Sequence, residues 1–199
     1  MTTAKKPILT TYNSVLIAIL TAMATILYMP QLQIPVVAFY KLDFSNFVVL
    51  LGGFAMGPVQ AMIILVLKAS ISLIWSGTMG IGELADVIIG TALILPATIL
   101  YHRNKTRKTA VIGMLVGTLC MVVGGVLANK WVMIPLFIQF IPFVKSMDDI
   151  LKMANVDSEW KLLLMATAPF NLLKGVVLCV VTGLIYKPLS PLLHGKMRR

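Results

Sequence analysis

Charged residues are scarce in this sequence. Only 12% of the 199 residues are Asp, Glu, Lys or Arg, and 59% are hydrophobic, whereas an ordinary soluble domain carries roughly 25% charged residues. This shortage argues against a soluble fold and indicates a protein surrounded by lipid. At roughly 20 residues per spanning helix, five or six spans and their connections use the whole sequence. We therefore expect residues 1–199 to form a single transmembrane domain.

Cysteine, histidine and the common catalytic motifs are equally sparse. Cys120 and Cys179 lie inside apolar runs, where packing is expected rather than a disulfide or a metal site. His102 and His194 lie in basic segments. The sequence contains no G-x-x-x-x-G-K-[ST] phosphate loop, no H-E-x-x-H and no G-x-S-x-G. We therefore predict neither ATP hydrolysis through a phosphate loop nor a metal site, and we assign no catalytic residues.

The apolar runs predict an all-α membrane protein, a bundle of six transmembrane helices. We place the helices at about residues 12–29, 43–56, 58–75, 82–101, 109–143 and 162–186, the fifth interrupted at Asn129 and Lys130. Pro30 and Pro35 predict an extended outer loop over residues 30–42. The charged residues of 144–161 predict a polar outer loop with one short amphipathic helix.

The basic residues indicate the orientation of the bundle. The net charge is +10, but the Lys and Arg side chains sit at the ends of apolar runs, which is typical of a membrane protein and not of a nucleic-acid-binding face. With cytoplasmic N- and C-termini, the cytoplasmic segments hold 10 of the 17 basic residues and no acid: Lys5, Lys6, Arg103, Lys105, Arg107, Lys108, Lys187, Lys196, Arg198 and Arg199. This imbalance favours an even number of spans.

Five ionisable residues fall within the predicted helices: Lys68, Glu83, Asp86, Lys130 and Lys174. Each costs at least about 2.5 kcal/mol to insert, so each needs a partner, a cavity or a function. Glu83 and Asp86 are three residues apart and share a helix face. Two interpretations stay open here: Lys68 forms an ion pair with one of these acids, or the two acids form a catalytic pair.

A second polar set lies in the last two helices. Asn171 and Lys174, three residues apart, place an amide and an ammonium group on one face, after Pro169. Together with Asn129 they are suited to a small-molecule site in an apolar cavity. Hydrogen bonding between helices without a ligand is the alternative.

Small residues recur four apart in three of the predicted helices. The pairs are Ala18 and Ala22, Gly53 and Gly57, and Gly113 and Gly117. Such spacing lets two helix backbones approach closely.

Three stretches resemble signatures of a known family: Lys41-Leu42-Asp43-Phe44-Ser45-Asn46, Leu51-Gly52-Gly53-Phe54-Ala55-Met56-Gly57-Pro58 and Gly80-Ile81-Gly82-Glu83-Leu84-Ala85-Asp86. They are similar to the substrate-binding S components of energy-coupling factor (ECF) transporters, and most of all to the riboflavin-specific members. This resemblance implies a six-helix bundle in a bacterial cell membrane with an outward-facing vitamin site, covered by the loop after the first helix. It also implies a complex with a transmembrane coupling protein and two cytoplasmic ATPases.

The resemblance also implies which residues bind. Asn129, Asn171 and Lys174 correspond to the vitamin contacts, followed by Glu83 and the loop residues Phe39, Tyr40 and Lys41. Ala18 and Ala22 correspond to the small-residue motif that faces the coupling protein. Riboflavin needs polar groups at its pyrimidine-like edge and apolar walls at its dimethylbenzene end. We look for those walls among Met79, Leu84 and Trp131.

The sequence therefore predicts a riboflavin-binding transport subunit and not an enzyme, with riboflavin as transported ligand and no cofactor. A stand-alone ion-coupled secondary transporter of a small amphipathic molecule is the alternative, because it would also carry carboxylates and lysines in its bundle. An intramembrane enzyme that uses Glu83 and Asp86 is a third interpretation.

Overall fold

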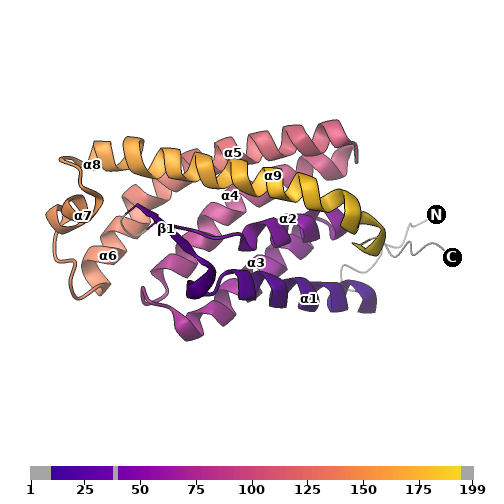
Figure 1. Ribbon diagram of the computed structural model, residues 1–199, viewed down its shortest axis with the longest axis horizontal. Coiled ribbons are helices and arrows are strands. Elements are labelled where there is room, and N and C mark those ends of the chain that lie inside the picture. The colour runs from indigo at the N-terminus through magenta and orange to yellow at the C-terminus, as the bar shows by residue number, and fades with distance from the viewer. Residues whose placement is uncertain (1–9, 38–39, 194–199) are drawn as a thin grey trace, which may run out of the picture.

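A computed structural model describes residues 10–37 and 40–193 and shows an elongated bundle of helices with one small hairpin (Figure 1). The α-helices are α1 (Thr11–Leu27), α2 (Ser45–Met56), α3 (Pro58–Ser72), α4 (Ile81–Arg103), α5 (Arg107–Ala128), α6 (Ile134–Phe140), α7 (Met147–Ala154), α8 (Glu159–Lys161) and α9 (Ala168–Leu193). Short 3-10 turns, η1 (Pro30–Leu32) and η2 (Leu73–Trp75), follow α1 and α3.

Among the described residues, four continuous helical stretches are long and apolar enough to cross a membrane. They are Pro58–Trp75, Ile81–Arg103, Arg107–Phe140 and Glu159–Tyr186. Helices α1 and α2 are apolar but shorter, at 17 and 12 residues. The 34 residues of the third stretch extend over about 50 Å at 1.5 Å per residue, well beyond a hydrocarbon core of about 30 Å.

The two longest stretches each contain a π-helical segment. These are η3 (Asn129–Met133), between α5 and α6, and η4 (Leu162–Thr167), between α8 and α9. Pro135 lies two residues after the end of η3, and Pro169 lies two residues after the end of η4. Proline has no N–H for the carbonyl four residues earlier, which weakens regular α-helical bonding at that point. The predicted interruption at Asn129 and Lys130 is therefore a change of helical pitch and not a break.

A two-stranded antiparallel hairpin connects α1 to α2. Strand β1 (Ile34–Val37) pairs with β2 (Tyr40–Leu42), with Pro35 opposite Lys41. Within the predicted extended loop over residues 30–42, extended backbone is confirmed for Ile34–Val37 and Tyr40–Leu42, whereas Pro30–Leu32 forms a 3-10 turn. In Figure 1 the hairpin lies against the bundle beside α9 and does not project from its end.

Glycine residues allow one tight turn and one close helix contact in the bundle. Gly57 has φ +128°, a left-handed value that glycine tolerates, and Pro58 begins α3 directly after it. Gly113 and Gly117 face α4, where an added Cβ would collide with the backbone carbonyls of Ala97 and Leu93. The predicted close contact through Gly113 and Gly117 is confirmed, and it brings α5 against α4.

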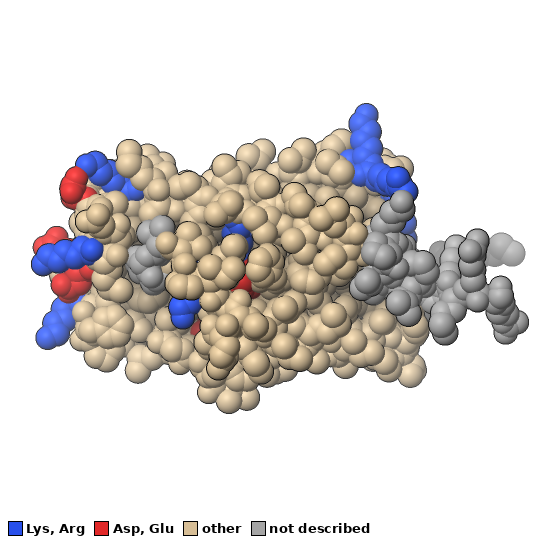
Figure 2. Space-filling view, viewed as in Figure 1, with Lys and Arg blue, Asp and Glu red and all other residues tan. Residues whose placement is uncertain are grey.

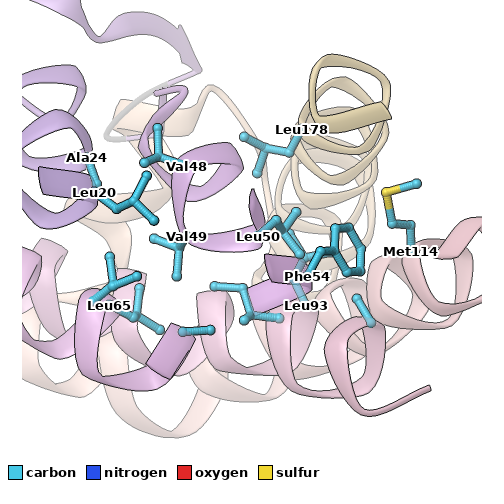
Figure 3. Packing of buried hydrophobic residues seen from close by; sticks show 14 of the residues in the cluster. Leu20, Ala24, Val48, Val49, Leu50, Phe54, Leu65, Leu93, Met114 and Leu178 are labelled. Carbon is cyan, nitrogen blue, oxygen red and sulfur yellow. The ribbon is translucent and has the colours of Figure 1, made fainter. Parts of the chain in front are cut away.

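Two apolar clusters fill the bundle. One includes Leu20, Val48, Phe54, Leu93 and Leu178 and joins α1, α2, α4 and α9 (Figure 3). The other packs the hairpin against the π segments and the α6 to α8 region, through residues such as Tyr40, Met133, Ile150 and Phe170. Polar side chains and a cavity lie beside these two clusters, as described below.

Side chains of both charges gather at one end of the molecule and only Lys and Arg are visible at the other, while a few charged side chains also show in the middle of this face (Figure 2). The beginning of α1, the end of α9 and the α4–α5 connection lie at one end, opposite α7 and α8 (Figure 1). Helix α7 is the short helix predicted in residues 144–161. Its capping box joins Ser146 and Asp149.

Candidate functional site

A pocket opens between the hairpin, α4, the π segment η3 and the first turns of α9. Its open space, mouth included, amounts to about 1060 Å³. The predicted contacts Asn129, Asn171, Lys174, Glu83, Tyr40 and Lys41 all line it. Phe39 lies outside the described residues.

A buried ion network forms the floor of the pocket. The side chain of Lys68 is 0% exposed, and its Nζ donates to Ser45 Oγ and Asn46 Oδ1, both at 2.8 Å, and pairs with Asp86 at 2.5 Å. An ammonium group has three N–H donors, so these three acceptors use all of them. The predicted pairing of Lys68 with an acid is confirmed, and Lys68 is left with no donor for a ligand.

Lys174 is held differently. Its Nζ donates to Asp43 Oδ2 at 2.7 Å, and Asp86 Oδ1 lies farther away at 3.8 Å. Asp43 in turn accepts from the backbone N–H of Ser45 at 3.0 Å and from its hydroxyl. Lys174 therefore keeps N–H donor capacity toward the pocket, and the two lysines balance the charges of Asp43 and Asp86.

Asn129 begins the π segment η3, and Asn171 lies in α9, shortly after η4 ends. Asn129 donates through Nδ2 to the Gly125 carbonyl at 2.9 Å, and Asn171 donates through Nδ2 to the Thr167 carbonyl at 2.8 Å. An added Cβ at Gly125 would collide with the Asn171 amide, so glycine at this position lets the two helices bring their amides together. The structure thus gathers both predicted amides and the predicted ammonium group into one pocket.

Tyr40 closes the side of the pocket formed by the hairpin. Its ring stacks on Phe170 with centroids 5.0 Å apart, and its hydroxyl bonds to Asn129 and Thr167. Burial raises the pKa of Tyr40 to about 12, so the hydroxyl keeps its proton at neutral pH. Lys41, next in the strand, is exposed at the pocket mouth.

Glu83 lies apart from the ion network. Its Oε2 accepts from Ser76 Oγ at 2.8 Å, and Ser76 Oγ in turn accepts from the Gly80 N–H at 2.9 Å. Asp86 is engaged with Lys68 and Asn46. Glu83 and Asp86 share a helix face, as predicted, but each is bonded to different neighbours, and neither is bonded to the other.

The apolar wall differs from the one expected. Met79, Leu84 and Trp131 do not line the pocket, and Met79 and Trp131 are 70% and 66% exposed. Leu84 and Trp131 follow pocket residues by one and two positions, which turns their side chains to another helix face. The residues that do provide the apolar wall are Ile89, Met121, Met133, Phe137 and Phe170.

Several pocket residues were not predicted from the sequence. Asp43, Asn46 and Tyr28 line the pocket, and Thr167 bonds to Tyr40 beside it. Asp43 and Asn46 flank Ser45, the first residue of the apolar helix α2. Polar residues at the start of an apolar helix were the feature of the sequence from which they could have been predicted as pocket residues. Lys130, another of the five ionisable residues expected within the helices, lies elsewhere: its Nζ is 4.1 Å from the centroid of the Trp160 ring.

Two further groups lie away from the pocket. Ala18 and Ala22 are exposed on α1. Cys120 and Cys179 are free thiols, and Cys179 contacts the hydroxyl of Thr118. Within residues 10–37 and 40–193, no three His, Cys, Asp or Glu side chains are grouped so that they could hold a metal ion.

Comparison with known proteins places this architecture. The family described as "ECF transporter, substrate-specific component" matches residues 13–186. The chain is similar to the riboflavin transporter RibU of Staphylococcus aureus, with 27% identity over 87% of this chain and 88% of the relative. It is also similar to the riboflavin transporter FmnP of Bacillus subtilis, with 28% identity over 89% and 91%.

The chain is also similar to a third riboflavin transporter and to a solved structure. The riboflavin transporter RibU of Streptococcus thermophilus is 30% identical over 89% of this chain and 82% of its own length. A solved S component of a bacterial ECF transporter superposes with a TM-score of 0.71 at 25% identity, covering 92% of this chain and 98% of that one. The chain belongs to the family of substrate-specific components of ECF transporters.

Proposed function

We propose that this chain is the riboflavin-binding subunit of an ECF-type vitamin uptake transporter. One observation carries the proposal: amide and ammonium groups from two helices converge on a pocket whose other walls are apolar and aromatic. A neutral, flat ligand with one polar edge and one apolar end matches this division. The riboflavin transporters to which the chain is similar support this choice of ligand.

The individual contacts follow from the donors that remain available. Lys174, Asn129 and Asn171 meet the polar edge of the flavin ring. Glu83 and Lys41 complete the site on the sides of α4 and the hairpin, where Tyr40 contributes its ring. Phe39, outside the described residues, is a further proposed contact. Met121, Met133, Phe137 and Phe170 enclose the apolar end of the ring.

In a membrane, the bundle crosses six times with both ends in the cytoplasm. The two short apolar helices, α1 and α2, add two crossings to the four long stretches, and the hairpin fills the depth that the 12 residues of α2 leave uncovered. Arg103, Lys105, Arg107 and Lys108 mark the cytoplasmic end. The pocket then opens toward the outside.

Transport requires partners in this proposal. The chain binds a transmembrane coupling protein and two cytoplasmic ATPases, which drive reorientation of the loaded bundle. The exposed alanines of α1, Ala18 and Ala22, give the coupling protein a smooth surface for close helix contact. We assign no catalysis to the chain itself.

Purification in detergent tests the ligand. If the proposal holds, the protein is yellow and shows a flavin spectrum that survives dialysis, or its ligand-free form binds added riboflavin with saturation at one site. Failure to bind riboflavin in both experiments contradicts the proposal. Uptake into vesicles that lack any ATPase, lost when the proton gradient collapses, would instead favour an ion-coupled secondary transporter.

A further inference from the structure

The Tyr40 hydroxyl connects the two π segments across the top of the pocket. It donates to Oδ1 of Asn129 in η3 at 3.2 Å and is bonded to Oγ1 of Thr167 in η4 at 2.5 Å. Tyr40 is itself buried in the hairpin and stacked on Phe170. A residue of the hairpin thus reaches both long helices at the positions where their pitch changes.

Two hydroxyl protons serve this hydrogen-bond chain, one from Tyr40 and one from Thr167. The amide oxygen of Asn129 can only accept, so the Tyr40 proton points toward Asn129. The Tyr40 oxygen then accepts from the Thr167 hydroxyl at 2.5 Å, and the Leu162 carbonyl lies farther from that hydroxyl, at 3.2 Å. At its far end, Asn129 donates one N–H to the Gly125 carbonyl at 2.9 Å.

We propose that Tyr40 is a positioning residue that fixes the Asn129 amide so that it offers its second N–H, and not its oxygen, to the ligand. This inference rests on the proposed function, in which Asn129 contacts riboflavin. The ligand atom at Asn129 is accordingly an acceptor, such as a ring carbonyl oxygen or an unprotonated ring nitrogen. Without the Tyr40 hydroxyl only the Gly125 carbonyl holds the amide, and the amide oxygen loses the donor that keeps it from the ligand.

Asn171 supplies the complementary group. Its Nδ2 donates to the Thr167 carbonyl, which directs its oxygen away from that bond and makes an acceptor available. A donor from Asn129 beside an acceptor from Asn171 matches a ligand edge on which a carbonyl and an N–H alternate. The pyrimidine-like edge of a flavin has this pattern.

Two side-chain contacts fix the hairpin and the residue that follows it against η4 and α9. Tyr40 meets Thr167, and Asp43 meets Lys174 at 2.7 Å. Three residues of extended chain cover about 10 Å, and seven residues of helix cover about 10.5 Å, so the two spacings agree. Asn171 lies between the two anchoring residues, which places it opposite the strand that carries Tyr40.

A double-mutant cycle on riboflavin binding by the full chain in detergent tests the inference. We expect Tyr40→Phe to raise the Kd by about 5- to 30-fold, because it removes the hydroxyl that is bonded to Asn129 and Thr167 and leaves the ring in place. In an Asn129→Ala background the same change should alter the Kd by less than about twofold, since the amide that it positions is gone. Equal factors in the two backgrounds, or no effect of Tyr40→Phe alone, would overturn the inference.

Thr167→Val gives a second, independent cycle if Asn129→Ala binds too weakly to titrate. It should raise the Kd alone and add nothing to Tyr40→Phe, because both variants interrupt one hydrogen-bond chain. Additive effects of these two variants would overturn the inference.

Tyr101→Phe is the matched control. It also removes a tyrosine hydroxyl bond, to Tyr186 at 3.0 Å, but Tyr101 does not line the pocket. It should leave the Kd within about twofold, whatever it does to the unfolding temperature. If Tyr101→Phe weakens binding as much as Tyr40→Phe does, the Tyr40 effect is a general loss of packing and the inference is wrong. Failure of the wild-type chain to bind riboflavin would refute the proposed function, whereas an additive cycle refutes only the role of Tyr40.

Discussion

Nζ of Lys174 lies 2.7 Å from Oδ2 of Asp43, which joins the last helix to the residue where the hairpin meets α2. Both side chains are buried. A buried ion pair stabilises little relative to an apolar pair, but removal of one partner leaves an uncompensated charge. We expect Lys174→Met to lower the free energy of unfolding by about 3–5 kcal/mol, measured by denaturation in detergent with circular dichroism.

Two variants check that the cost comes from the stranded carboxylate. Adding Asp43→Asn to Lys174→Met should recover part of the loss, because the unpaired charge is removed. Lys161→Met is the control, since Lys161 and Asp157 form an ion pair whose side chains are 48% and 84% exposed. It should cost less than about 1 kcal/mol. Equal losses from Lys161→Met and Lys174→Met would contradict the account.

The contact of α5 with α4 depends on glycine. Gly117→Ala should lower the free energy of unfolding by about 1–3 kcal/mol, because the new Cβ would collide with the Leu93 carbonyl and force the helices apart. Gly183→Ala is the matched control in α9, where an added Cβ meets nothing within 4 Å. It should be neutral or stabilising by up to about 1 kcal/mol. A neutral Gly117→Ala in the same denaturation experiment would show that the two backbones do not need this closeness.

The exposed face of α1 can be separated from the pocket. Ala18→Leu with Ala22→Leu should leave riboflavin binding by the purified chain unchanged, because both positions are exposed and neither lines the pocket. The same variant should abolish uptake in cells that supply the coupling protein and ATPases, since bulky side chains prevent close helix approach. Ser70→Leu, an exposed substitution on α3, should preserve uptake. Normal uptake by the double variant Ala18→Leu and Ala22→Leu would exclude this surface as the docking site.

Much of the polar interior follows from the sequence, because an ionisable side chain in an apolar helix needs a partner. Lys68 was expected to pair with Glu83 or Asp86, and it pairs with Asp86. The convergence of Asn129, Asn171 and Lys174 was also predicted, since few polar residues interrupt the last two long helices.

The rest depends on tertiary structure that no local pattern encodes. Asp43 was assigned to the beginning of a helix, and its burial depends on a hairpin that lies against the bundle beside α9. Trp131 was expected in the apolar wall, but it lies two residues beyond Asn129 and is turned away from the pocket. The π segments were not predicted either, although Pro135 and Pro169 mark both of them.

The central claim is that the amide and ammonium groups of α9 bind the flavin. Titration of the purified chain with riboflavin, comparing the wild type with Asn171→Ala and Lys174→Ala, tests it most directly. The account predicts that each variant loses at least about 1–3 kcal/mol of binding free energy, because a buried hydrogen-bond partner of the ligand is removed. Unchanged affinity in both variants would contradict it.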